Sequence, residues 1–197
     1  MHNDSAGEEP ETWAAAVEGD ASSFGLVYDR HRNAVYRHAL RVSRSVTDAE
    51  DITAMAFVEL WNKRRAVRIV NGSVLPWLVV TTIHVASNLV RSRNRYALAL
   101  ARLPPPESRE EPSAAVDARL DRAALYREVG LLYTDLSPIH KDVVALCVLE
   151  ELSHSEAAAV LRVPVGTVKS RLTRAKAALA AGLSLDNPFA EKGDSHA

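Results

Sequence analysis

The fold of this chain is decided by residues 153–179, which read SHSEAAAVLRVPVGTVKSRLTRAKAAL. Ser153, followed three residues later by Glu156, forms a capping-box pattern, which marks the start of a helix. A tight turn is expected at residues 162–164, and a second helix is expected to open at residues 165–168. Two short helices joined by such a turn predict a helix-turn-helix, a motif that places its second helix in the major groove of DNA.

The second helix of this motif has an apolar stripe, and its polar and cationic residues face roughly away from it. The apolar residues at helical spacing are Val168, Leu172, Ala175 and Leu179. A small cationic face suits the major groove, where Ser170 and Arg174 are the best candidates for base edges. Gly166 lets the first backbone amides of the helix approach a phosphate. The predicted DNA-binding residues are Gly166, Thr167, Lys169, Ser170, Arg171, Thr173 and Arg174.

The composition limits the class of protein. The chain has 197 residues, of which 47% are hydrophobic and 25% are charged, so it can form one ordinary domain or two small ones. Its single cysteine, Cys147, excludes an internal disulfide and fits a reducing compartment, so we expect a cytoplasmic protein. The N-terminus is acidic, and the apolar stretch at residues 77–86 is too short to span a bilayer. We therefore expect neither a signal peptide nor a membrane segment.

The charges are distributed unevenly, although the net charge is only −1. Residues 60–102 and 162–185 contain Lys and Arg but no Asp or Glu. Acids gather instead at the N-terminus, at residues 48–51 and at residues 107–111. Two basic blocks separated by an acidic stretch predict two contact patches on one long polyanion.

A proline-rich segment divides the chain into two halves. Residues 103–113 read LPPPESREEPS, and consecutive prolines favour an extended backbone. Every periodic segment on either side has helical spacing, and none alternates like a strand. We therefore predict an all-α protein of two small helical domains joined by a Pro- and acid-rich linker. Its predicted parts are an acidic N-terminal extension (1–21), a first domain (22–103), the linker (104–117), a second domain with the helix-turn-helix (118–183) and a tail (184–197).

Local signals indicate where the helices begin. Thr47 and Glu50 form a capping-box pattern, with Thr47 as the N-cap of a helix that continues to about Trp61. Ser73 is expected to cap the next helix, which tolerates Pro76 in its first turn. Further helices are predicted at about residues 24–42, 73–95 and 118–133, and another opens at Ser137-Pro138.

The predicted helix at residues 73–95 carries two distinct faces. Its buried stripe is expected to hold Val74, Leu78, Thr82, Val85 and Leu89. Its other face combines an aromatic ring, two side chains that bond base edges and two cations, which suits single-stranded nucleic acid. In the alternative, Trp77 packs against the neighbouring helix and His84 is an ordinary surface histidine. The residues of this face are Trp77, His84, Asn88, Arg91 and Arg95.

Other chemistry has little support in the sequence. Cys147 lies in an apolar run at residues 143–149, so it is expected to pack in a core rather than act as a nucleophile. The histidines show no metal-ligand spacing, and the pair His31 and His38 is expected on the apolar side of a helix. The sequence contains no glycine-rich phosphate loop. We therefore predict neither an enzyme nor a cofactor.

At these residues the chain resembles a bacterial sigma factor of the extracytoplasmic-function (ECF) type, over about residues 22–103 and 118–183. Residues 48–61 resemble the polymerase-binding helix of that family, residues from Trp77 onward resemble its promoter-melting helix, and residues 164–175 resemble its C-terminal helix-turn-helix. The resemblance implies that the two faces described above hold the melted −10 element and read the −35 element. It implies that the residues binding polymerase are Asp48, Asp51, Ile52, Phe57 and Trp61.

The resemblance therefore implies a promoter-specificity subunit whose partners are core RNA polymerase and promoter DNA, with an anti-sigma factor as a further candidate. One alternative is a stand-alone helix-turn-helix regulator that needs no polymerase. Another is a protein-binding decoy that captures a sigma antagonist. A left-handed backbone at Arg162, where the family usually has a turn glycine, would cost about 1 kcal/mol. The departures from the family pattern are His84, Ala54, Met55, Ala157 and Arg162.

Overall fold

The structure, a computed structural model, describes residues 9–100, 133 and 135–185 and is all-α, as predicted. Within these residues the nearest approach to a β-structure is an isolated bridge between Val70 and Ser73. The predicted linker and almost all of the predicted helix at 118–133 lie outside the described residues. The elements are α1 (Glu9–Val17), α2 (Ala21–Ser43), α3 (Val46–Lys63), the 3-10 turn η1 (Arg64–Ala66), α4 (Leu75–Leu100), α6 (Pro138–Val144), the π-helical turn η2 (Ala145–Leu149), α7 (His154–Leu161) and α8 (Val165–Leu185).

The cap of α7 is the one predicted, whereas the cap of α3 is not. The Ser153 hydroxyl accepts the Glu156 N–H at 3.3 Å, and the Glu156 carboxylate accepts the Ser153 N–H at 2.7 Å, which completes the capping box. For α3 the prediction of Thr47 as N-cap is wrong, because the Ser45 hydroxyl accepts the Asp48 N–H. Arg44 ends α2 in a left-handed conformation, so the chain turns early and Ser45 already stands at the entrance of the next helix.

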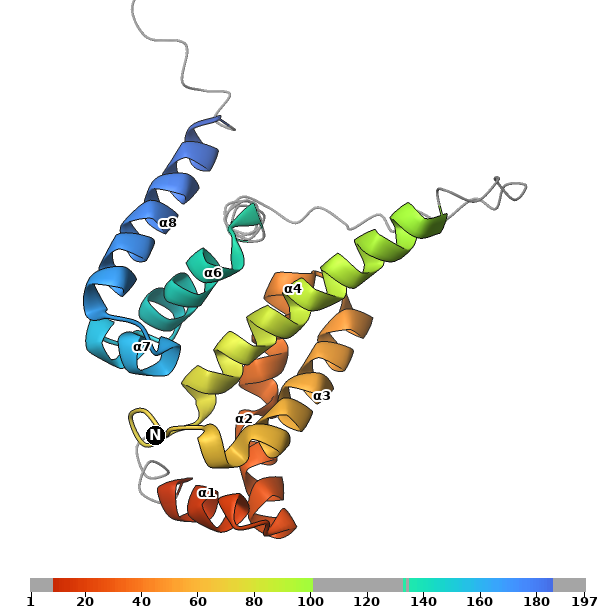
Figure 1. The fold of residues 1–197 in the computed structure, drawn as a ribbon, viewed down its shortest axis with the longest axis vertical. Helices are drawn as coiled ribbons and strands as arrows, with labels where there is room; N and C mark the ends of the chain where they lie inside the picture. The colour runs from red at the N-terminus through yellow and green to blue at the C-terminus, as the bar shows by residue number, and fades with distance from the viewer. Residues whose placement is uncertain (1–8, 101–132, 134, 186–197) are drawn as a thin grey trace, which may run out of the picture.

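The first domain is a bundle in which α2, α3 and α4 lie side by side and α1 crosses the end of α2 (Figure 1). Its core includes Trp13, Val35, Phe57 and Leu60. The stripe predicted for α4 is buried at Val74, Leu78, Thr82 and Val85 and half-buried at Leu89. The segment predicted as an acidic extension contributes α1, whose Trp13 and Ala16 are buried in this bundle.

The second domain packs α6, α7 and α8 around an apolar cluster that includes Val143, Leu146, Val168 and Leu172. Cys147 packs against this cluster, as predicted, and burial raises the pKa of its thiol. Ser137 is the N-cap of α6 but its side chain makes no capping hydrogen bond, and Pro138 occupies the first turn. The predicted helix-turn-helix is formed by α7 and α8, which are joined by the turn at Arg162.

The two domains contact each other along α4, beside which α6 lies in Figure 1. An apolar cluster joins Val79 and Ile83 of α4 to Ala145 of η2. Polar contacts also cross between the domains in the part of the chain that the structure describes, among them a side-chain hydrogen bond of Glu156 with Asn71. Others join His84 to Asp142 (3.1 Å), His38 to Glu150 (2.7 Å) and the Arg162 guanidinium to the Ala66 carbonyl (2.7 Å). Within the described residues, no helix has the length and apolar character needed to cross a membrane.

Candidate nucleic-acid interface

The apolar stripe predicted for α8 faces the core of the second domain. Val168 and Ala175 are fully buried, Leu172 is buried and Leu179 is half-buried. This packing turns the opposite face of α8 outward and holds it rigidly. Of the predicted DNA-binding residues, Thr167 and Arg171 are half-buried, and the exposed ones are Gly166, Lys169, Ser170, Thr173 and Arg174.

The hydroxyl groups on this face already donate hydrogen bonds to the helix itself. The Ser170 hydroxyl donates to the Thr167 carbonyl, and the Thr173 hydroxyl donates to the Lys169 carbonyl, both at 3.0 Å. Each hydroxyl oxygen keeps lone pairs that can accept a bond from a base amino group. The groups left to donate on this exposed face are the cationic side chains, above all Arg174, whose guanidinium matches a guanine edge.

The turn between α7 and α8 stores backbone strain at Arg162. This residue has φ 54° and ψ 44°, the left-handed conformation that was anticipated as costly for any residue other than glycine. Its N–H donates to the Ala158 carbonyl and closes α7. Its side chain reaches the first domain at Ala66, so the strained position also carries one of the contacts between domains.

Two substitutions separate the strain at Arg162 from its contact. Both Arg162→Gly and Arg162→Ala remove the bond to Ala66, but only glycine adopts the left-handed conformation without strain. We expect the glycine variant to be more stable than the alanine variant by about 1 kcal/mol. Urea unfolding followed by circular dichroism measures the difference, and equal stabilities would contradict the assigned strain.

The second predicted face, on α4, is only partly exposed. His84, Asn88, Arg91 and Arg95 are exposed. Trp77 is half-buried and packs against the core cluster of the first domain. This packing agrees with the alternative in which Trp77 packs against its neighbours, and a stacking role for the uncovered part of the indole stays a prediction.

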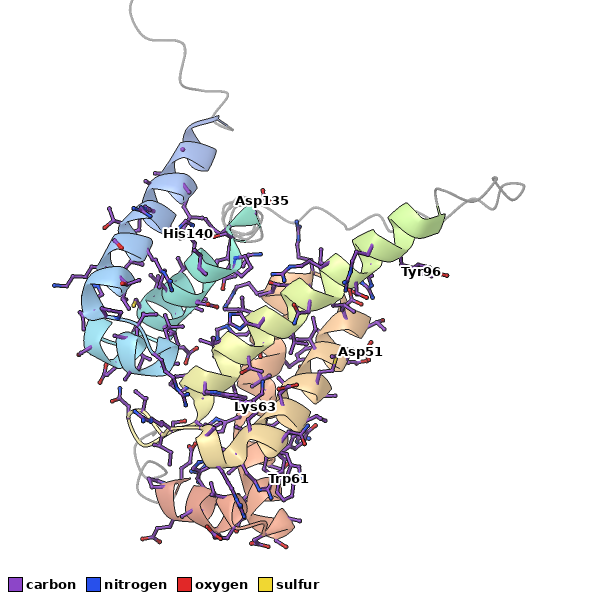
Figure 2. The ribbon with its side chains drawn as sticks, viewed as in Figure 1. Asp51, Trp61, Lys63, Tyr96, Asp135 and His140 are labelled. Carbon is purple, nitrogen blue, oxygen red and sulfur yellow. The ribbon has the colours of Figure 1, made fainter. Side chains whose placement is uncertain are left out.

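His84 and Asn88 line a groove of about 460 Å³ between α3 and α4. Thr81 and Lys63 line the same groove, and both were missed by sequence reasoning. Figure 2 labels Lys63, at the end of α3. No local pattern marks Lys63 as a partner of α4, because only the packing of α3 on α4 brings it there. The full lining is Ala54, Met55, Val58, Glu59, Lys63, Thr81, His84, Val85 and Asn88.

His84 is held at the edge of this groove by the other domain. Its imidazole Nε2 lies 3.1 Å from Oδ2 of Asp142, a carboxylate that is almost fully buried. The bond with Asp142 raises the pKa of His84, although burial and the nearby charges of Arg91 and Lys63 act in the opposite direction. The second carboxylate oxygen of Asp142 is buried and has no hydrogen-bond partner. The contact with His84 is therefore the side-chain hydrogen bond that compensates for the burial of this carboxylate.

The raised pKa of His84 makes the contact between domains sensitive to pH. Protonated His84 stabilises the arrangement in which the two domains are in contact, here called the closed arrangement. This stabilisation is complete below the ordinary pKa near 6.5 and is lost as the pH rises through the raised pKa of His84. Because the side chain is half-exposed, we expect only about a twofold to threefold fall in the closed fraction between about pH 6 and pH 8.5. Small-angle X-ray scattering of the full chain measures this fall, because separation of the two domains increases the radius of gyration.

The matched control for this pH effect is His84→Gln, which lacks the titrating ring. It is expected to show a smaller increase, because the side chain at this position no longer gains a proton as the pH falls. An equal increase in both proteins would contradict the role of His84.

The residues expected to bind polymerase on α3 divide into buried and exposed ones. Ile52 and Phe57 are buried and pack within the bundle, and their part in binding polymerase stays a prediction. Asp48 is bonded by both terminal nitrogens of Arg93, and this bond lowers the pKa of the carboxyl. Trp61 packs edge-on against Phe24 with its ring centroid 4.2 Å from the Arg64 guanidinium carbon.

Asp51 is the one residue of the predicted five whose side chain is exposed (Figure 2). Met55 and Val58, on the same helix, are 50% and 59% exposed, although both are apolar. Exposed apolar side chains on one helix are typical of a protein-contact surface.

Among the described residues, no group of three or more His, Cys, Asp or Glu could hold a metal ion.

Comparisons with known proteins cover both domains. Residues 27–96 match the family described as Sigma-70 region 2, and residues 128–179 match Sigma-70, region 4. The ECF RNA polymerase sigma factor SigE of Mycolicibacterium smegmatis is 31% identical over 75% of this chain, which spans 56% of the length of that relative. The ECF RNA polymerase sigma factor SigW of Bacillus subtilis is 25% identical over 82% of this chain and 89% of SigW.

A solved structure has a similar arrangement of helices. CnrH, solved in complex with the cytosolic domain of CnrY, has a TM-score of 0.59 and is 25% identical. The match covers 91% of this chain and 99% of CnrH.

Proposed function

Because this chain belongs to the extracytoplasmic-function sigma factors, we propose that it is a promoter-specificity subunit of RNA polymerase. In this role the first domain docks on core polymerase and holds the opened −10 element, and the second domain reads the −35 element as duplex. The observation that supports the proposal is the presence of two separate surfaces with polar and cationic side chains in one chain, the groove beside α4 and the exposed face of α8. A stand-alone regulator needs only the second.

The exposed face of α8 supports reading of the −35 element. Lys169 and Arg174 are exposed on α8 whereas Val168 and Ala175 are buried, so α8 can enter a major groove without disturbing its own packing. Gly166 lies open at the helix start, and nothing comes within 4 Å of the position a Cβ would occupy there. A phosphate can therefore approach the first amides of α8.

The groove between α3 and α4 supports binding of the opened −10 strand. Asn88 and Thr81 supply hydrogen-bonding groups, and Lys63, which is paired with Glu59 at 2.7 Å, supplies a cation that the strand backbone can share. Arg91 and Arg95 continue the cationic track along exposed turns of α4. Trp77 contributes the uncovered part of its ring at the start of the same helix.

The exposed surface of α3 supports docking on polymerase. Met55 and Val58 offer apolar area, and Asp51 offers a charge at the rim of that area. Docking also explains how two weak DNA contacts become useful, because tethering both domains to one polymerase makes the second contact effectively intramolecular.

The proposed function is tested by reconstituting the full chain with core RNA polymerase. We expect the chain to associate with core polymerase and to select start sites in a promoter library transcribed in vitro. Sequencing of the transcripts then identifies the −35 and −10 elements. Tight binding to a palindromic duplex without polymerase would favour the stand-alone regulator instead. Failure to associate, or association without start-site selection, would refute the proposal.

We also propose that the protein acts in the cytoplasm, where promoter DNA and polymerase are found, and that it works by binding rather than by catalysis. The single cysteine supports the reducing compartment. An anti-sigma factor remains a candidate partner. CnrH was solved in complex with the cytosolic domain of CnrY, which supports testing for a protein that captures this chain.

A further inference from the structure

Glu9 is a buried carboxylate in a part of the chain that lies before the matched family regions. It is the first residue of α1, and only 4% of its surface is exposed. Burying a charge is costly unless other groups compensate for the lost water. A buried carboxylate at Glu9 therefore needs hydrogen-bond donors or positive charges around it, and these come from α2 and from the segment just before α4.

The Glu9 carboxylate is bonded to α2 and to the start of α4. Its Oε1 accepts the Val74 N–H at 2.8 Å and the Ser73 hydroxyl at 3.1 Å, and it lies 2.8 Å from Nε2 of His31. Its Oε2 lies 3.5 Å from the guanidinium of Arg30. Burial alone would raise the pKa of Glu9, but the bonds from His31, Val74 and Ser73 hold it below the ordinary value. Glu9 is therefore ionised near neutral pH.

These bonds add to the local cap that Ser73 forms at the start of α4, as the sequence predicted. The Leu75 N–H donates to the Ser73 hydroxyl, Pro76 has no N–H, and the Trp77 N–H donates to the Val74 carbonyl. The Val74 N–H itself is satisfied by Glu9. The first turn of α4 is thus also held by a negative charge from another helix, which the helix dipole favours.

The segment just before α4 is also held by packing, because Val74 is fully buried in the core of the first domain. It reverses in a tight turn in which Val70 and Ser73 exchange two backbone hydrogen bonds. Asn71 and Gly72 in this turn both have positive φ. Through Ser73 and Val74, Glu9 fastens the exit of this turn to the bundle. The position of Trp77 in the first turn, and of Thr81 one turn later, follows from that attachment and from the packing of Val74.

We propose that Glu9 is a positioning residue for promoter melting, which sets the start of α4 so that Trp77 and the groove residues receive the opened strand in the correct register. The inference rests on the proposed function of the first domain. Glu9 itself touches no nucleic acid in this role. Its effect on the opened DNA strand is transmitted through Val74, whose carbonyl accepts a hydrogen bond from the N–H of Trp77.

The test compares Glu9→Gln with wild type in holoenzyme on two templates, a fully duplex promoter and the same promoter already unpaired at the −10 element. Glutamine keeps the shape but loses the charge that strengthens these hydrogen bonds. We expect initiation on the duplex to fall about threefold to tenfold, and initiation on the unpaired template to change less than about twofold. The fluorescence of 2-aminopurine at the −10 element measures the opening rate directly.

Glu11→Gln is the matched control, because Glu11 is an exposed carboxylate in the same first turn of α1. It is expected to behave as wild type on both templates. Thermal unfolding of each variant, and its affinity for core polymerase, separate positioning from lost folding.

Each outcome of this test is informative. An equal loss on both templates, or a loss explained by weaker polymerase binding, would overturn the role of Glu9 and leave the proposed function intact. If wild type initiates from neither template, the proposed function fails, and the inference fails with it.

Discussion

Replacing Arg174 by alanine is expected to lower −35-dependent initiation by roughly one to two orders of magnitude. The side chain is exposed on α8, opposite the buried stripe, and its guanidinium is suited to a bidentate bond with a guanine edge worth about 1–3 kcal/mol. In vitro transcription with the reconstituted holoenzyme measures the loss. The effect should disappear on a template whose −35 element has been replaced, because no base remains for Arg174 to read.

Lys169→Ala is the comparison for Arg174. Lys169 is also exposed on α8 but is expected to contact phosphate. Its loss should weaken binding to all DNA sequences alike. It should also reduce the slope of the logarithm of the binding constant against the logarithm of the salt concentration by about one. Should Arg174→Ala instead weaken all sequences alike, Arg174 contacts only the DNA backbone.

Replacing Ile52 by alanine is expected to destabilise the first domain by about 2–5 kcal/mol, the usual cost of a cavity at a fully buried site. Polymerase binding should fall with stability, because α3 loses the packing that presents its exposed surface. Denaturant unfolding measures the first effect, and a pull-down on core polymerase at several temperatures measures the second.

Met55→Asp is the counterpart of Ile52→Ala on the same helix. Met55 is half-exposed, so the charge should leave the free energy of unfolding within about 0.5 kcal/mol while it weakens polymerase binding. If Ile52→Ala left stability unchanged yet abolished binding, Ile52 would have to contact polymerase directly, contrary to its burial.

Signals that are local in sequence predicted much of this structure. Ser153 and Glu156 satisfy each other's backbone within one turn, so their capping box could be read directly. The apolar spacing of Val168, Leu172 and Ala175 likewise predicted which face of α8 is buried. Ser45 was missed because the end of α2 at Arg44, and not the helix that follows, decides where the chain enters α3.

Features that depend on distant residues could not be predicted. Glu9 meets Val74, 65 positions away, and His84 meets Asp142, 58 positions away, so no periodic pattern joins them. Ile52 and Phe57 show a different limit. Their motif predicted a contact with polymerase, which stays a prediction, but it did not indicate that both side chains are buried in the bundle.

The contact of α4 with α6 covers apolar side chains where the two domains meet. His84 on one domain lies 3.1 Å from Asp142 on the other, and Val79 and Ile83 cluster with Ala145 across the same junction. Any separation of the domains would expose these three apolar side chains to water at a free-energy cost. Under the proposed function, docking on polymerase would have to compensate for that cost wherever the domains move apart to reach both promoter elements.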